Sequence, residues 1–273
     1  TKASTVVIKL DDAEKAWELP LAKVFPAVSN AEPQAALPAF AKKTHRSLTD
    51  IQKNPVFYTP RRHPRVLIPV FPGTNCEYDM ARAFNIAGAD TKILVFRNNS
   101  EQALSDSLAE LERQLKKAQI LALSGGFSAG DEPDGSGKFI ATTFRNPVIS
   151  EAVNDLLKNR DGLALGICNG FQALIKLGLV PNGEIVEIKE NDPTLTFNTI
   201  GRHISHMAYT RVTSTKSPWF SSVNAGDVFA VPVSHGEGRF VATDETVKKL
   251  IENGQVATQY VDLKGNPSQD IQF

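Results

Sequence analysis

One short stretch, Gly162–Gln172, constrains the fold of this chain more than any other. It starts as an apolar run typical of a buried strand and continues after Gly170 with helical periodicity. Gly166 and Gly170 flank Cys168 between these two parts. A reactive side chain between glycines at a strand-to-helix turn is the arrangement of a nucleophile elbow, here with cysteine in place of serine. We therefore predict that Cys168 lies on a sharp turn between a strand and a helix.

Two interpretations of Cys168 are open from this pattern alone. The N–H groups at the start of the following helix would favour the thiolate, which is the nucleophilic form. The alternative is a buried structural cysteine at the end of a core strand, the usual role of a lone cysteine. The flanking glycines favour the nucleophile, because they permit a strained turn and leave room for a substrate.

Strand and helix patterns alternate between Arg65 and Leu177. The predicted strands are Arg65–Phe71, Thr91–Phe96, Ile120–Leu123 and Leu163–Ile167, and the predicted helices are Glu77–Ala87, one through Leu104–Leu115 and one starting at Asn146-Pro147. This order predicts an α/β fold, a doubly wound, mostly parallel sheet with helices on both faces. Ligands bind such sheets at the carboxyl ends of the strands, where Cys168 and the glycine-rich loop Ser124–Asp131 both fall.

The pattern changes after Leu179. Strand-like segments dominate at His206–Thr213, Val228–Val233 and Val256–Asp262, with a helix at Glu245–Glu252. We expect these strands to form an antiparallel extension of the sheet.

Composition excludes several classes of protein. The formal net charge is zero, so no basic stripe indicates nucleic acid and no charge block indicates a membrane surface. The sequence has neither an apolar run long enough to span a bilayer nor a secretory signal pattern at its first residues. With 41% hydrophobic residues it can bury a substantial core, and two cysteines are too few for a disulfide framework. A cytoplasmic enzyme fits best.

Three motifs together carry a family resemblance. These are Gly166–Gly170 (G-I-C-N-G), Ser124–Asp131 (S-G-G-F-S-A-G-D) and Val233–Arg239 (V-S-H-G-E-G-R). The chain from about Arg65 onward resembles the glutaminase domain of large-type phosphoribosylformylglycinamidine synthases, a class I glutamine amidotransferase with a flavodoxin-like fold. The resemblance implies hydrolysis of L-glutamine to glutamate and ammonia through a thioester. It also implies that the ammonia feeds an ATP-dependent synthetase region in purine biosynthesis; ATP and Mg²⁺ would belong to that region, with no cofactor or metal in this domain.

The resemblance assigns roles to individual residues. Cys168 would be the nucleophile, and backbone N–H groups at Gly125, Gly126 and Asn169 would stabilise the oxyanion. Residues Gln172, Ser234 and His235 would hold the glutamine. The alternatives are an ordinary glycine turn after a strand for Gly125 and Gly126, and a solvated helix residue for Gln172. Cys76 lacks the flanking glycine turn, so we expect a loop thiol at the rim of the site.

The general base is the weak point of this assignment. The family uses a His-x-Glu pair near the end of the domain, and no histidine follows His235 in this sequence. The tail at 261–267 resembles the region just upstream of that pair, so we expect the pair to be missing from a truncated chain. His235 and Glu237 have the same spacing, but we interpret them as the separate substrate loop. His203 and His206 are spaced as in some metal sites, without a cysteine or carboxylate arranged with them.

The remaining expectations concern the first residues and the rival functions. Residues 1–64 are rich in proline and are expected to be a linker and the tail of a preceding synthetase region, with residues 65–273 forming the glutaminase domain. Within 1–64, Val6–Ile8 could close a strand, and Asp11–Leu21 and Leu48–Lys53 could be helical. One rival function is a Cys-elbow hydrolase of the same fold; another is a non-catalytic glutaminase-like docking domain.

Overall fold

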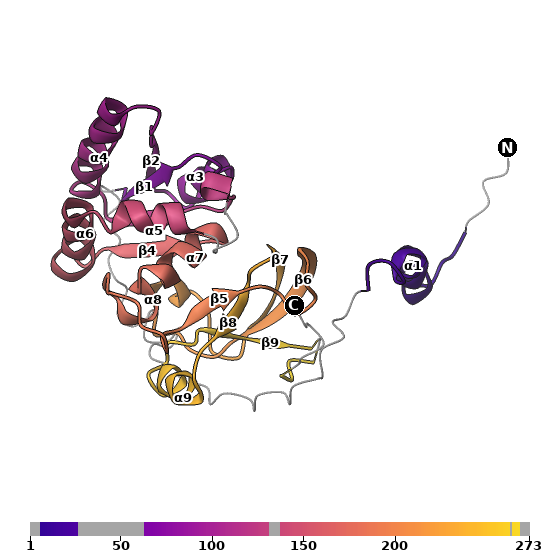
Figure 1. Cartoon of the computed structure of the whole chain (residues 1–273). Helices are drawn as coiled ribbons and strands as arrows, with labels where there is room; N and C mark the ends of the chain where they lie inside the picture. Colours follow the sequence, from indigo (N-terminus) through magenta and orange to yellow (C-terminus); the bar gives the residue numbers. More distant parts are fainter. Residues whose placement is uncertain (1–5, 27–62, 131–136, 263, 268–273) are drawn as a thin grey trace.

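A computed structural model of the chain describes residues 6–26, 63–130, 137–262 and 264–267 (Figure 1). Its centre is a parallel sheet of β1 (Arg65–Val70), β2 (Asp90–Val95), β3 (Ile120–Leu123) and β4 (Leu163–Gly166). The strand order is β2-β1-β3-β4. All three neighbouring pairs run parallel, so the carboxyl ends of the four strands meet at one edge. The predicted parallel sheet is confirmed.

The two faces of this sheet are buried against different helices. On β1 and β3, Leu67, Leu121 and Leu123 point into one apolar cluster, while Val66, Ile68, Ile120 and Ala122 point into the other. This alternation follows from the two-residue period of a strand. The first cluster packs on α4 (Glu101–Leu115), α5 (Lys138–Phe144), α6 (Pro147–Asn154) and α7 (Asn169–Lys176), and the second on α3 (Glu77–Ile86). Helices therefore cover both faces, as predicted.

The C-terminal strands form two separate antiparallel sheets. One contains β6 (Ile204–Val212), β7 (Val228–His235) and β9 (Thr258–Val261) in the order β7-β6-β9. The other pairs β5 (Thr194–Thr196) with β8 (Arg239–Val241), and α9 (Asp244–Glu252) follows it. In the described residues these strands do not pair with β1–β4, so the antiparallel part accompanies the parallel sheet instead of extending it.

Trp219 joins the two parts. It lies on a 3₁₀ turn, Pro218–Phe220, and its indole Nε1 donates to the carbonyl oxygen of Ala164 on β4 at 3.2 Å. Its ring meets Phe84 of α3 edge-on, with 6.2 Å between centroids. The 3₁₀ turn between β6 and β7 thus contacts β4, the last strand of the parallel sheet, through a side chain and not through strand pairing.

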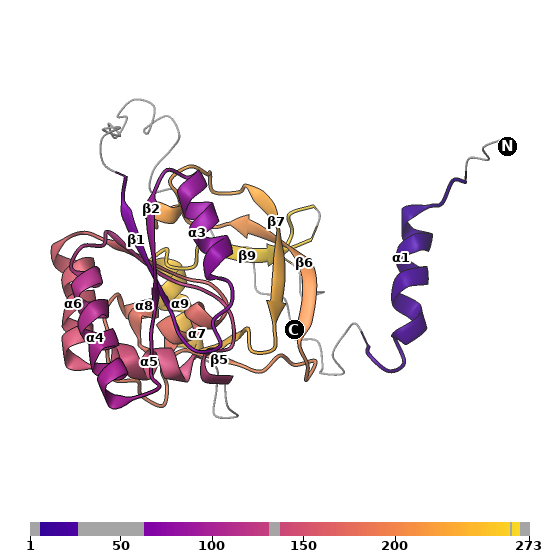
Figure 2. The same ribbon diagram turned by 90° about the horizontal axis from the view of Figure 1, so that it is seen from above.

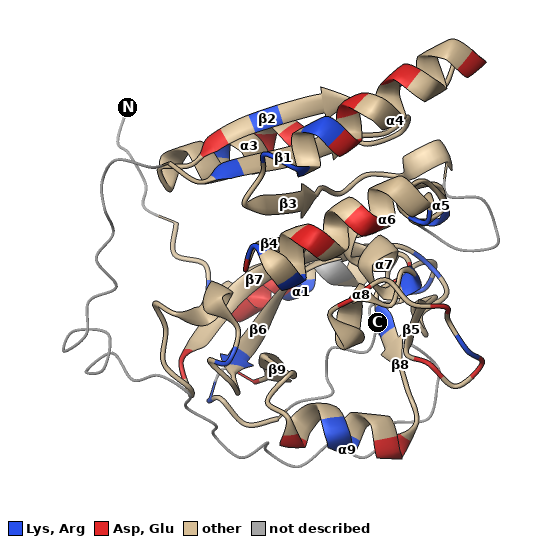
Figure 3. Cartoon of the chain, turned by 90° about the vertical axis from the view of Figure 1, so that its left-hand side faces the viewer, with Lys and Arg blue, Asp and Glu red and all other residues tan. Residues whose placement is uncertain are grey.

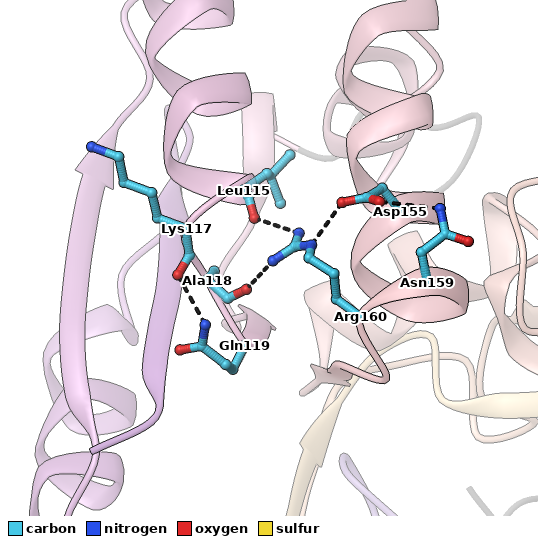
Figure 4. Close-up of polar contacts among 7 residues, drawn as sticks. All are labelled: Leu115, Lys117, Ala118, Gln119, Asp155, Asn159 and Arg160. Atoms are coloured by element: carbon cyan, nitrogen blue, oxygen red, sulfur yellow. Dashed lines mark hydrogen bonds and ion pairs between the residues drawn. The ribbon is translucent and has the colours of Figure 1, made fainter. Parts of the chain in front are cut away.

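Arg160 closes the C-terminal end of α4 (Figure 4). It follows a π-helical turn, Asp155–Asn159, and donates to the carbonyl oxygens of Leu115 at 2.8 Å and Ala118 at 2.6 Å. Its Nε donates to Asp155 at 2.6 Å. Terminal carbonyl groups of a helix lack partners within it, so a guanidinium that reaches them stabilises its end.

The exposed helices carry charges of both signs (Figure 3). On α4, Glu110 pairs with Arg113 and Glu112 with Lys116; on α9, Glu245 pairs with Lys249. These are pairs within one helix at neighbouring turns. No described helix is long and apolar enough to cross a membrane.

The described part of 1–64 contains α1 (Leu10–Glu18) and a 3₁₀ turn at Leu19–Leu21, which confirms the helical expectation there. Figures 1 and 2 show α1 apart from the rest of the molecule. The strand expected at Val6–Ile8 is wrong, because these residues are exposed and outside any strand. The helix expected at 48–53 lies outside the described residues. The division of the chain at residue 64 stays a prediction.

Candidate active site

The turn at Cys168 has the geometry of a strained elbow. Cys168 adopts φ 52° and ψ −111°, a left-handed φ that side chains other than glycine rarely take. Gly166 and Gly170 have no room for a side chain: a Cβ on Gly166 would lie 2.6 Å from the carbonyl oxygen of Gly170, and one on Gly170 would collide with the backbone of Leu123. The flanking glycines therefore let α7 pack tightly against β3 and β4 while Cys168 remains exposed.

The thiol lies where two sheets meet. Cys168 is the N-cap residue of α7, so the first N–H groups of that helix stabilise negative charge on the sulfur. Its Sγ lies 3.6 Å from the carbonyl oxygen of Ser234, on β7 of the antiparallel sheet.

The glycine loop after β3 lies beside the elbow. Gly126 has φ +131°, and a Cβ there would lie 2.7 Å from the carbonyl oxygen of Gly73. Two backbone hydrogen bonds join this loop to the loop after β1. The N–H of Phe127 donates to the carbonyl oxygen of Gly73 at 2.9 Å, and the N–H of Asn75 donates to the carbonyl oxygen of Gly125 at 3.4 Å. No backbone hydrogen bond in the described residues uses the N–H of Gly126. This close approach of two backbones explains why residue 126 is glycine, and the oxyanion role of Gly125 and Gly126 stays a prediction.

A chain of carboxamides connects the loops around the thiol. Ser128 N–H donates to Asn169 Oδ1 at 3.2 Å, and Asn169 Nδ2 donates to Gln172 Oε1 at 3.0 Å. Gln172 Nε2 then donates to the carbonyl oxygen of Glu237 at 2.8 Å. Asn169 is 1% and Gln172 6% exposed, so Gln172 is not a solvated helix residue. Its carboxamide holds the 237 loop against α7.

These segments enclose a pocket of about 330 Å³, large enough for an amino acid. Its lining residues are Gly126, Phe127, Cys168, Gln172, Phe197, Gly201, Arg202, His203, His235, Gly236 and Glu237. Four predicted site residues thus line one pocket. Gly125, Asn169 and Ser234 lie directly behind this lining, as the contacts above show.

Arg202 and Phe197 also line the pocket although the sequence did not predict them, and His203 had no predicted role there. The Nε2 of His203 lies 2.9 Å from the hydroxyl of Ser234, so His203 belongs to the pocket. The described residues contain no group of three histidine, cysteine or acidic side chains that could hold a metal ion. Arg202 and His203 follow β5 in a loop without a regular pattern, and no sequence signal would have found them.

The second cysteine, Cys76, is exposed and does not line the pocket. A Cβ on Gly125 would touch Cys76 Sγ at 3.4 Å and Cys168 Cβ at 3.5 Å, so Gly125 separates the two residues. Burial raises the pKa of the Cys76 thiol, and the negative charges of Asp79 and Glu77 raise it further. A raised pKa lowers the thiolate fraction of Cys76 and makes it a weaker nucleophile.

Comparison with known proteins agrees with this geometry. The sequence model of the CobB/CobQ-like glutamine amidotransferase domain matches residues 63–273. The chain therefore belongs to the CobB/CobQ-like glutamine amidotransferase family.

Individual relatives make the similarity more specific. The phosphoribosylformylglycinamidine synthase subunit PurQ of Methanococcus maripaludis is 33% identical over 207 residues, covering 75% of this chain and 70% of the relative. The same subunit of Rhodopseudomonas palustris is 34% identical over 198 residues, covering 72% of each chain. Among solved structures, PurLQS from Thermotoga maritima matches with a TM-score of 0.53 and 25% identity, over 77% of this chain and 79% of that chain.

Proposed function

We propose that this chain is the glutaminase part of a phosphoribosylformylglycinamidine synthase, with Cys168 as its nucleophile. The observation that carries the proposal is the strained Cys168 at the start of α7, in one pocket with Gly126, Gln172 and His235. The similarity to PurQ subunits supports the reaction class, and the likeness to a PurLQS structure supports a synthetase partner.

The chemistry follows from the groups around the thiol. The Cys168 thiolate attacks the side-chain carbonyl carbon of L-glutamine, and the carbonyl oxygen takes the negative charge. Backbone N–H groups at Gly125, Gly126 and Asn169 stabilise that charge. As the C–N bond breaks, the leaving nitrogen takes a proton from a water molecule and departs as ammonia, and the hydroxide that remains is the form of that water which attacks the thioester. Water hydrolyses the resulting thioester to glutamate and restores the thiol. This domain uses no metal or cofactor, and the synthetase supplies the ATP and Mg²⁺ chemistry.

The substrate is held by the loops that meet at the pocket. Ser234 and His235 bind the amino-acid end of glutamine, while Gln172 fixes the 237 loop and thereby the width of the pocket. His235 is part of this substrate loop in the proposal and does not deprotonate Cys168.

The test uses the enzyme assembled with its synthetase. Cys168→Ala should abolish glutamine-dependent synthesis and preserve synthesis from added ammonia, because the synthetase chemistry takes place elsewhere. Cys76→Ser is the matched cysteine control, since Cys76 does not line the pocket; it should retain glutamine-dependent synthesis. Loss of both activities in Cys168→Ala, or full glutamine-dependent synthesis by that variant, would show that Cys168 is not the nucleophile.

A further inference from the structure

Asn198, a buried residue just after β5, holds two of the pocket loops together. It is 3% exposed. Its Nδ2 donates to the carbonyl oxygens of His235 at 2.8 Å and Arg202 at 3.0 Å, and its backbone N–H donates to Gly236 at 2.9 Å. One carboxamide thus connects the loop that carries Arg202 with the loop that carries His235.

The same carboxamide determines which ring nitrogen of His235 carries the proton. Two carbonyl oxygens surround the Nδ2 of Asn198, and its Oδ1 accepts from the N–H of Gly238 at 3.3 Å. This Oδ1 lies 2.9 Å from Nδ1 of His235. A carboxamide oxygen can only accept, so Nδ1 must be the donor. In the neutral ring the acceptor is then Nε2.

Gly238 provides the space that this ring position requires. A Cβ on Gly238 would lie 2.6 Å from Cγ of His235 and would also collide with Nδ1 and Cε1. Gly236, in the same loop, would meet nothing within 4 Å if it carried a Cβ. The ring of His235 is therefore held between the Asn198 carboxamide and the backbone of Gly238.

We propose that Asn198 is a positioning residue for glutamine binding, which holds His235 so that its Nε2 accepts a hydrogen bond from the α-ammonium group of glutamine. This inference rests on the proposed function. His235 lines the pocket, and the carboxamide end of glutamine must reach Cys168 in that pocket, which leaves the amino-acid end for the loops around His235. An ammonium group is a charged donor, and its hydrogen bond to a fixed acceptor is stronger than one between neutral groups.

Kinetics of two variants in the assembled enzyme test the inference. Asn198→Ala and Gly238→Ala should each raise KM for glutamine by roughly 10-fold to 100-fold, the value of one lost hydrogen bond to a charged group. Turnover at saturating glutamine should fall much less, and ammonia-dependent synthesis should persist. An unchanged KM in both variants, or a loss confined to kcat, would overturn the inference, because binding would then not depend on the held ring.

A second readout is independent of activity. Nitrogen NMR of the His235 ring in the complete protein should show the Nδ1-protonated form in the wild type and its loss in Asn198→Ala. Gly236→Ala should leave the ring signals as they are, and Gly238→Ala should shift them. A wild-type ring protonated on Nε2 would overturn the inference even if Asn198→Ala failed to fold. The ring signal can be measured without turnover. A protein that lacks glutaminase activity would therefore refute the proposed function without deciding how Asn198 holds the ring.

Discussion

The Sγ of Cys168 lies 3.6 Å from the carbonyl oxygen of Ser234, a residue 66 positions further along the chain. Cys168 belongs to the edge of the parallel sheet, whereas Ser234 belongs to β7 of the separate antiparallel sheet. The pocket therefore exists only when both sheets are folded and docked. The nucleophile is supplied by the first sheet, and most of the substrate loops by the second.

Gln172 tests this connection between the sheets. Gln172→Leu removes two hydrogen bonds in a buried place, the one that Gln172 donates to Glu237 and the one that it accepts from Asn169. We expect a cost of about 1–3 kcal/mol in the free energy of unfolding and a raised KM for glutamine.

The matched control is Gln102→Leu, because the exposed Gln102 bonds to Asp106 on its own helix and to no other side chain in the described residues. It should change the unfolding free energy by less than about 0.5 kcal/mol. The free energy of unfolding of both variants is measured by denaturant unfolding, and their KM for glutamine by steady-state kinetics. Wild-type KM and stability in Gln172→Leu would mean that the carboxamide chain does not hold the pocket.

Arg160 gives a prediction about stability alone. Arg160→Ala removes the donors to Leu115 and Ala118, so the end of α4 loses its cap. We expect a loss of about 2 kcal/mol in the free energy of unfolding, measured by urea denaturation.

Arg113→Ala is its control, since within the described ranges Arg113 pairs with Glu110 alone, on the exposed face of the same helix. An exposed pair of this kind contributes about 0.2–1 kcal/mol. Equal losses in the two variants would contradict the capping role of Arg160.

The two central strands of the parallel sheet, β1 and β3, were predictable because their apolar runs are buried on both faces. Helix α5 was missed because Lys138–Phe144 is short, contains two threonines and follows a glycine-rich segment. The separation of the antiparallel sheets was also missed. Strand periodicity indicates which residues face a core, but it does not indicate which strands will pair with one another. Here the antiparallel strands pair among themselves and not with β4.

The site was predictable where a backbone constraint leaves a mark in the sequence. Gly126, Gly166 and Gly170 lie where a side chain would collide, and the glycine spacing around Cys168 therefore indicated the elbow. Asn198 left no such mark, because its role depends on loops that meet only in the folded chain.

The contribution of His235 to the stability of the folded protein changes with pH in a defined direction. Burial lowers its pKa, and the charge of His203 lowers it further. The folded protein then prefers the neutral ring, so the unfolded chain binds a proton first as the pH falls. The stability contributed by this group is intact above about pH 6.5 and declines below it, until the folded ring also titrates.

An NMR titration should therefore give the His235 ring a midpoint below about pH 6.5, which is the ordinary pKa of histidine. Asn198→Asp should raise that midpoint, because it places a carboxylate beside Nδ1 and favours the charged ring. Arg202, His203, Glu237 and Cys168 line the same pocket, and they are unchanged in this variant. A wild-type midpoint above 6.5, or a lower midpoint in Asn198→Asp, would contradict the contact.

The central claim is that Cys168 is the nucleophile of a glutaminase, and covalent labelling tests it most directly. The assembled enzyme is treated with an electrophilic analogue of glutamine, with and without excess glutamine, and the labelled peptides are mapped by mass spectrometry. We predict one adduct, on Cys168, that glutamine suppresses. Cys76 should remain unlabelled, because it does not line the pocket that binds the analogue and its raised pKa lowers its thiolate fraction. An adduct on Cys76, with Cys168 unmodified, would contradict the account.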